Sequence, residues 1–132
     1  MAEGEWGDST LLKKLPNPSS SAYEVEINCP ELTFLGVLNQ PDFAHLRIII
    51  HHGEWIIELK SLKEYLGAFR DSVMSYERLI NVIYDDIMEK YGPQRLRLEM
   101  DCNARGGISS KLKIDSDWKV RGGQELYQNW KE

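Results

Sequence analysis

Apolar and polar residues alternate with a period of two in four segments of the chain, residues 23–29, 44–52, 95–102 and 108–115. Such alternation is typical of β-strands that bury one face and expose the other. The second segment turns through His52 and Gly53 into residues 54–58, which fits an antiparallel hairpin. The residues expected to face inward are Tyr23, Val25, Ile27 and Cys29 in the first segment, Leu96, Leu98, Met100 and Cys102 in the third, and Ile108, Leu112 and Ile114 in the fourth.

Two segments between the second and third of these strands, residues 61–70 and about 74–91, follow the period of an α-helix instead. Ser61 and Glu64 form an S-x-x-E capping box, which predicts that the first helix begins there. The Gly-Pro pair at 92–93 predicts the end of the second helix, because glycine tolerates a left-handed cap and proline cannot continue the helix. The expected buried stripes are Leu62, Tyr65, Leu66 and Phe69 in the first helix, and Ile80, Ile83, Tyr84, Ile87 and Tyr91 in the second.

The order β-β-α-α-β-β predicts an α+β domain in which two helices cover one face of a four-stranded antiparallel sheet. Residues 1–21 contain the run LPNPSSS and few periodic apolar positions, so we expect a flexible or loosely docked arm followed by a single domain at 22–132. A small sheet has two open edges, which must be protected or paired. We therefore expect pairing between subunits into a homo-oligomeric ring.

Composition narrows the possible functions. The chain has 132 residues, of which 42% are hydrophobic and 28% charged, and its net charge is −5. No apolar run approaches the roughly 20 residues of a membrane helix, and no secretory signal opens the sequence, so we expect a cytoplasmic protein without a membrane partner. The acidic balance and dispersed basic residues argue against direct nucleic-acid binding.

The cysteines and histidines give no sign of a metal site. Cys29 and Cys102 form no C-x-x-C motif and lie on apolar faces, so buried thiols are expected. His51 and His52 are adjacent on a predicted strand and would point to opposite faces, and His45 lies apart from them. No metal ligand set is therefore predicted.

Three features of the sequence carry candidate chemistry. Lys60 and Lys63 lie at the start of a predicted helix, where free N–H groups favour anions, and Tyr65 is near enough to stack on a bound group; the alternative is a solvated helix start with a packed aromatic. Glu77, in the first turn of the second helix, could accept two hydrogen bonds from a guanine-like base, or could simply complement the helix dipole. Asp42 follows Gln40-Pro41 and is either a proton donor or a turn residue.

These residues occur in one ordered set of motifs, namely NCPE at 28–31, QPDF at 40–43, ELKSLKEYL at 58–66, FR at 69–70, Glu77 and RGGI at 105–108. In this order they resemble the QueF-type reductases of 7-cyano-7-deazaguanine (preQ0), members of the tunnelling-fold superfamily. The segment at 58–66 fits the family's nicotinamide-cofactor motif, E-(S/L)-K-(S/A)-x-K-x-Y, at every specified position. The resemblance covers about residues 28–108.

The resemblance implies a reaction and a site. QueF-type enzymes reduce the nitrile of preQ0 to an aminomethyl group on the route to queuosine: a cysteine forms a thioimide, an aspartate supplies a proton and NADPH delivers hydride twice. They assemble as rings with pockets between subunits. Carried over to this chain, Asp42 would be the proton donor, Glu77 would anchor the deazaguanine with Glu58 and Tyr76 near the same site, and the cofactor-binding residues would be Lys60, Ser61, Lys63 and Tyr65.

The chain departs from the family where the nucleophile should be. Reductases have Leu-Cys-Pro before the Gln-Pro-Asp motif, whereas FLGVLNQPDF is one residue shorter and places Gly36 at the cysteine position, or Leu35 or Val37 if the gap moves. None of these can attack a nitrile. Cys29 is seven residues away, roughly 23 Å along an extended strand. The archaeal QueF-like amidinotransferases, which make archaeosine on tRNA, are also similar to the chain and also depend on that cysteine.

Three hypotheses follow from this departure. The first is an NADPH-dependent reductase of 7-deazaguanine metabolism that is inefficient or uses another nucleophile. The second is a divergent tunnelling-fold enzyme that acts on a pterin or deazapurine without covalent catalysis. The third is a non-catalytic subunit that binds ligand or completes a mixed ring.

Overall fold

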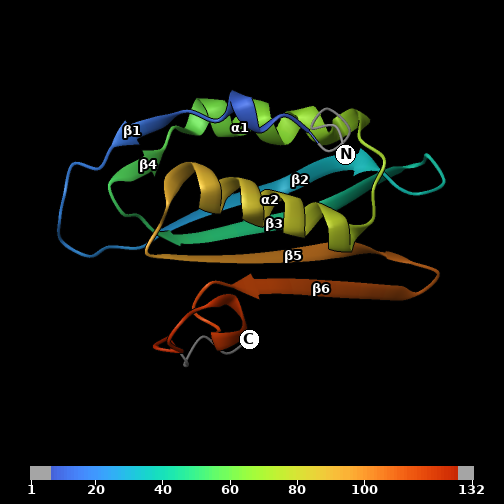
Figure 1. The fold of residues 1–132 in the computed structure, drawn as a ribbon. Coiled ribbons are helices and arrows are strands. Elements are labelled where there is room, and N and C mark those ends of the chain that lie inside the picture. Colours follow the sequence, from blue (N-terminus) through green and yellow to red (C-terminus); the bar gives the residue numbers. More distant parts are fainter. Residues whose placement is uncertain (1–6, 128–132) are drawn as a thin grey trace.

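The computed structural model describes residues 7–127 and contains a four-stranded antiparallel sheet with the strand order β2-β3-β5-β6 (Figure 1). Both α-helices lie on one face of this sheet, as the sequence predicts. A two-stranded sheet, β1-β4, lies beside them. The elements are β1 (Lys14–Pro16), β2 (Val25–Leu35), β3 (Pro41–His51), β4 (Trp55–Ile57), α1 (Leu59–Gly67), α2 (Tyr76–Tyr91), β5 (Arg95–Arg105) and β6 (Ile108–Asp115), with short 3-10 turns η1 (Ser9–Leu11), η2 (Ala68–Asp71) and η3 (Lys119–Arg121).

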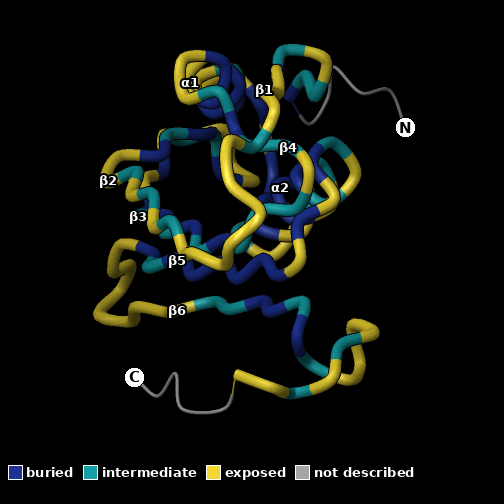
Figure 2. The backbone as a smooth tube through the Cα atoms, turned by 90° about the vertical axis from the view of Figure 1, so that its left-hand side faces the viewer, coloured by how far each residue is buried: buried dark blue, intermediate teal, exposed yellow. Residues whose placement is uncertain are grey.

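The core lies between the sheet and the two helices, where the buried segments gather in Figure 2. All nine residues of the predicted helical stripes are buried there, and the predicted inward residues of β5 are buried with them. Ile108 differs from the prediction and is 74% exposed. It opens β6 at the tip of the β5–β6 hairpin, beyond a register shift between Cys102 and Arg105, so the regular alternation does not reach it.

The first helix begins earlier than the capping box predicts. α1 starts at Leu59, and its N-cap is Glu58, whose carboxylate accepts a hydrogen bond from the Ser61 N–H at 2.8 Å. A carboxylate can cap a helix in this way as well as a hydroxyl, so a Ser-x-x-Glu pattern alone misplaced the start. The end of α2 is as predicted, because its C-cap Gly92 adopts the left-handed conformation with φ 52°.

Part of the N-terminal arm packs on the domain. β1 pairs with β4, and Leu12 is 1% exposed. The Lys13 carbonyl accepts a hydrogen bond from the Tyr91 hydroxyl at 2.7 Å, and the Lys13 N–H donates to Ser61 Oγ at 2.9 Å. Periodicity does not reveal this docking because the strand has only three residues; residues 1–6 lie outside the described part.

Charged side chains are buried on the sheet face opposite the helices. Arg97 and Asp115 are both 0% exposed, and Arg97 bonds to Asp115 and to Glu99. Arg95 makes two hydrogen bonds to Asp115, at 3.2 and 2.7 Å, while its guanidinium lies over the ring of Tyr127. Buried charges need such partners, so this network ties β5 to β6.

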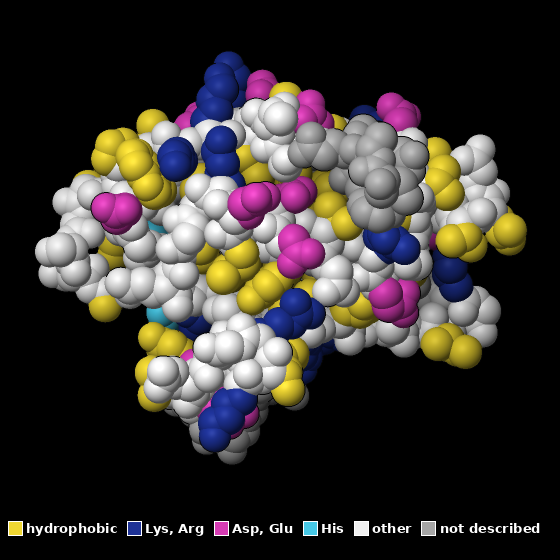
Figure 3. All heavy atoms as spheres, in the orientation of Figure 1, with side chains coloured by type: hydrophobic (Ala, Val, Ile, Leu, Met, Phe, Trp, Pro, Cys, Tyr) yellow, Lys and Arg dark blue, Asp and Glu magenta, His cyan; other side chains and the backbone are white. Residues whose placement is uncertain are grey.

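Two further observations concern possible partners. On the face shown in Figure 3, basic and acidic side chains are interspersed and form no continuous basic stripe. Among residues 7–127, no helix has the length and apolar composition to cross a membrane.

Candidate functional site

A tight turn occupies the position where the family's nucleophile would lie. The Gly36 N–H donates to the Gln40 carbonyl and the Asn39 N–H donates to the Gly36 carbonyl, both at 2.7 Å. Asn39 has a positive φ of 67°, a conformation that asparagine tolerates better than most residues. The turn joins β2 directly to β3 and leaves Gly36 buried.

Neighbouring side chains fill the space beside Gly36. A Cβ atom at this position would lie 2.1 Å from Gln40 Nε2 and 2.5 Å from Asp42 Oδ2. Both distances are far below van der Waals contact, so a side chain fits here only if Gln40 and Asp42 move. Residue 36 therefore has no side chain, and the space beside it is already filled by its neighbours.

Asp42 is buried next to this turn and faces a cation from another hairpin. It is 6% exposed, and its Oδ1 accepts hydrogen bonds from Arg105 Nε at 2.8 Å and from Arg105 Nη2. Its hydrogen bonds to Asp42 raise the pKa of the Arg105 guanidinium. Oδ2 faces Gln40 Nε2 at 3.5 Å, while Gln40 Oε1 is buried without a hydrogen-bond partner in the described part of the chain.

The start of α2 lies next to the residues just described, Gly36, Gln40, Asp42 and Arg105, and together they form what is called the corner below. The ring of Tyr76 meets Phe34 edge-on, with centroids 5.2 Å apart. Burial raises the pKa of the Tyr76 hydroxyl, the charge of Asp42 adds to this, and Arg105 opposes it. Glu77 is the next residue and is exposed. The structure thus brings three predicted residues, Asp42, Tyr76 and Glu77, to one end of the sheet.

Cys102 lies beside this corner and was not predicted as part of it. It is 5% exposed on β5, opposite Ala44 of β3. Burial raises the pKa of the Cys102 thiol, the charges of Glu77 and Asp42 raise it further, and a hydrogen bond with Ser110 opposes them. Only the register of β3 against β5 reveals this neighbourhood, which a sequence pattern does not specify.

Of the four predicted cofactor residues, two are exposed and two are buried. Lys60 and Lys63 are exposed on α1. Ser61 and Tyr65 are 1% and 0% exposed, so neither side chain faces solvent or a ligand in this arrangement. Ser61 Oγ donates to the Glu58 carbonyl at 2.7 Å and accepts from Lys13, so it anchors the arm.

Tyr65 lies in the core because its position on α1 faces the sheet. Its hydroxyl donates to Asp86 Oδ2 at 2.5 Å, and its ring packs edge-on against Phe69. Burial, followed by the charge of Asp86, raises the pKa of Tyr65 far above its ordinary value. This is the environment of a structural tyrosine.

Glu58 is not brought to the corner within one chain. It caps α1 at the β4 end of the molecule, whereas the two hairpin tips and the start of α2 lie at the opposite end (Figure 1). The hydrogen bond from Ser61 lowers the pKa of Glu58. The predicted site residues therefore form two separate groups, one at each end of α1.

The described residues contain no group of three or more His, Cys, Asp or Glu side chains arranged to hold a metal ion. His45 and His51 both belong to β3. His45 forms a hydrogen bond with Asn28 of β2, and His51 forms one with Glu24, the residue before β2.

The fold and corner define an α+β protein whose polar site sits where two hairpin tips meet a helix start. Residues 41–121 match the model of a family described as QueF-like protein. The chain is 37% identical over 109 residues to the NADPH-dependent 7-cyano-7-deazaguanine reductase of Prochlorococcus marinus, covering 79% of this chain and 78% of that protein. It is 39% identical over 120 residues to the enzyme of that name from Thermomicrobium roseum, covering 89% and 94%.

A solved structure shares the fold at low sequence identity. The crystal structure of the archaeosine synthase QueF-Like in the apo form matches with a TM-score of 0.62 and 9% identity, covering 74% of this chain and 94% of that one. The chain belongs to the QueF-like family, which confirms the resemblance found in its motifs.

Proposed function

We propose that this protein is an NADPH-dependent oxidoreductase that acts on preQ0 or a related 7-deazaguanine-type heterocycle without a thiol-bound intermediate at residue 36. The names of its relatives support the reaction class. The observation that carries the proposal is the corner itself, where a buried carboxylate lies beside a glycine that has replaced the nucleophile and whose side-chain space is filled.

Asp42 provides the proton in this proposal. Arg105 binds only Oδ1, so Oδ2 is the oxygen that can carry a proton on the Gly36 side. As hydride reaches the carbon, first of the nitrile and then of the resulting imine, the electron pair moves to nitrogen, which takes a proton from Oδ2 in each step. Solvent then returns a proton to Asp42. Gln40 must swing aside to admit the heterocycle, which fits its unsatisfied Oε1.

Glu77 and the α1 lysines provide binding. The exposed Glu77 carboxylate, in the first turn of α2, can accept hydrogen bonds from the amino and ring N–H groups of a deazaguanine. Lys60 and Lys63 carry positive charge near the start of α1 and fit phosphate groups. When bound, NADPH supplies the hydride.

The two groups of residues would form one site between subunits. Glu58 and Lys60 lie at one end of α1 and the Asp42 corner lies beyond its other end (Figure 1). β2 and β6 are the outer strands of the sheet, so each presents an open edge to a neighbouring copy. A homo-oligomeric ring would pair one such edge with an edge of the next copy, and residues of both copies would then complete the site.

A second candidate function is a non-catalytic ligand-binding or assembly subunit. It is favoured by the Asp42–Arg105 pair and the closed space at Gly36, which together leave little room for substrate. Complete absence of NADPH binding would favour this candidate over the reductase.

The double substitution Lys60→Ala and Lys63→Ala tests the cofactor assignment. Because both lysines are exposed, the protein should remain folded while NADPH affinity falls about a hundredfold, as expected for two lost phosphate contacts. NADPH fluorescence titration measures this, with Lys119→Ala, an exposed lysine of the C-terminal segment, as the control. Unchanged affinity in the double variant would reject the assignment.

A further inference from the structure

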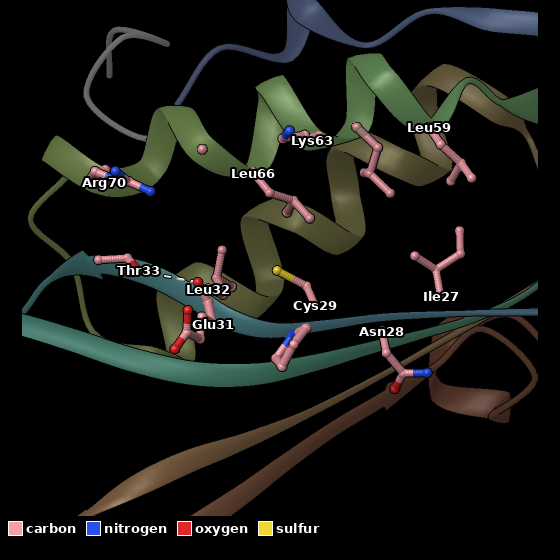
Figure 4. A pocket seen from close by; sticks show the side chains of 13 residues that line it. Ile27, Asn28, Cys29, Glu31, Leu32, Thr33, Leu59, Lys63, Leu66 and Arg70 are labelled. Atoms are coloured by element: carbon pink, nitrogen blue, oxygen red, sulfur yellow. Dashed lines mark hydrogen bonds between the residues drawn. The ribbon is translucent and has the colours of Figure 1, made fainter.

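A cleft runs along α1 on the side of the open sheet edge. It has a volume of about 330 Å³ and lies between β2 and α1 (Figure 4). Its floor and roof are mainly apolar and come from Ile27, Cys29, Leu32, Leu59, Leu62 and Leu66. In Figure 4 the Cys29 side chain points up from β2 toward the helix, into the space between the two elements.

Two cations stand on the helical side of this cleft. Lys63 and Arg70 both line it, are exposed, and make no ion pair among residues 7–127. Glu31 is the one carboxylate among the lining residues, and Figure 4 shows it on the side of β2 away from α1. In a chain with a net charge of −5, two uncompensated cations over an apolar cleft favour a ligand with an anionic group and a flat apolar group.

The cleft connects the two groups of site residues. Its Leu59 end adjoins Lys60, and its Arg70 end adjoins Thr33, beyond which β2 continues to the Gly36 turn. Lys63 and Arg70 are seven residues apart, about 10 Å along the helical path. β2 also carries a register irregularity between Cys29 and Leu32, with Pro30 inside it, which shapes the floor of the cleft.

We propose that this cleft binds the adenosine-phosphate part of the nicotinamide cofactor, with the Arg70 guanidinium as a phosphate ligand beside Lys63. This inference rests on the proposed function. The cleft is too small for a whole dinucleotide but accommodates a flat ring between the leucines and the β2 residues. The planar guanidinium of Arg70 binds a phosphate through two parallel hydrogen bonds. Cys29 lines this subsite and performs no chemistry.

The rate at which the Cys29 thiol is chemically modified tests this proposal without any measurement of catalytic activity. This thiol is half-buried inside the cleft, whereas Cys102, the other cysteine, is 5% exposed. N-ethylmaleimide should therefore modify Cys29 first, at a rate that mass spectrometry of the digested protein follows. Saturating NADPH or adenosine 2′,5′-bisphosphate should slow that modification about tenfold or more, because either would fill the cleft.

Arg70→Ala should weaken NADPH binding about tenfold and raise the NADPH concentration that protects Cys29 by the same factor, while Lys119→Ala, which also removes one positive charge, should change neither. NADPH binding without protection of Cys29, or full affinity in Arg70→Ala, would overturn this inference and leave the proposed function standing. Absence of NADPH binding would overturn both. Cys29 that reacts only after dilution to monomers would show that a second copy covers the cleft, which also overturns it.

Discussion

At the scale of single residues, the decisive feature is the absence of a side chain at Gly36. The turn is closed by backbone hydrogen bonds, and the side chains of Gln40 and Asp42 occupy the adjoining space. Covalent catalysis divides a difficult addition into easier steps, so the proposed reaction, which uses no thiol at residue 36, must rely on proton donation and positioning. Asp42 is the buried acid available for this role, and Arg105 holds one of its two oxygens.

Restoring the thiol alone should not restore covalent chemistry. Gly36→Cys should give no covalent adduct with preQ0 and should lower the free energy of unfolding by about 1–3 kcal/mol, because the new Cβ overpacks the corner. Gly36→Cys with one residue inserted in the turn should form the adduct, detected as added mass on the intact protein.

Gly36→Ala is the control for this pair, since it adds the same Cβ without a thiol. An adduct in the single Gly36→Cys variant would show that the corner has room for a nucleophile. Failure of the lengthened variant, if it folds, would show that the pocket itself has diverged and not only its nucleophile.

At the scale of elements, α1 combines a structural face with an exposed face. Tyr65 and Ser61 are buried and fix the core and the N-terminal arm, while Lys60 and Lys63 remain exposed. A motif that fits a cofactor-binding pattern at every position therefore contains both buried structural residues and exposed residues that are free to bind a ligand. Of the four motif residues predicted to bind the cofactor, only the two exposed lysines are placed to reach a ligand.

Tyr65→Phe separates these duties. Loss of its hydrogen bond to Asp86 should lower the free energy of unfolding by about 1–2 kcal/mol, measured by urea denaturation, and leave NADPH affinity unchanged. Tyr91→Phe is a matched control because it also removes one buried hydroxyl, the donor to the Lys13 carbonyl. A tenfold loss of NADPH affinity in folded Tyr65→Phe alone would show that Tyr65 reaches the cofactor.

Much of this architecture could be predicted because local patterns carry it. Periodicity identified the four long strands and the two buried helical stripes, and the Gly-Pro pair at 92–93 marked the end of α2. It missed β1, which is too short for a pattern, and the Ser61–Glu64 capping box placed the start of α1 too late, since the N-cap is Glu58. Asp42, Tyr76 and Glu77 came from motifs, and Arg105 lies in the RGGI motif. The closed turn, the pairing of Arg105 with Asp42 and the position of Cys102 depend on three-dimensional register, which no sequence period encodes.

At the scale of the whole molecule, a buried charge network holds the outer face of the sheet. Glu99 is 6% exposed; burial acts to raise its pKa, but hydrogen bonds from Arg97 and Arg47 outweigh that effect and lower it below the ordinary 4.5. A carboxylate with a lowered pKa stabilises the folded state above pH 4.5, and this contribution is lost as the pH falls through the folded-state pKa. The protein should therefore lose stability in that acidic range.

Glu99→Gln should lower the free energy of unfolding at pH 7 by about 3 kcal/mol, because it leaves buried arginines undercompensated. The difference from wild type should shrink as the pH falls below 4.5, where denaturation curves at a series of pH values would follow it. Glu26→Gln, which removes a half-exposed partner of Arg47, should cost less than about 1 kcal/mol. Equal costs for the two variants would contradict the role given to burial.

The central claim is that the corner reduces its heterocycle without a thiol. The most direct measurement is the loss of nicotinamide absorbance when NADPH and preQ0 are added to wild type, to a Cys29→Ala/Cys102→Ala variant and to Asp42→Asn. The proposed function predicts that oxidation of NADPH survives without either cysteine and is lost in Asp42→Asn. Oxidation that disappears in the folded cysteine-free variant would contradict it, because a thiol would then take part in the reaction.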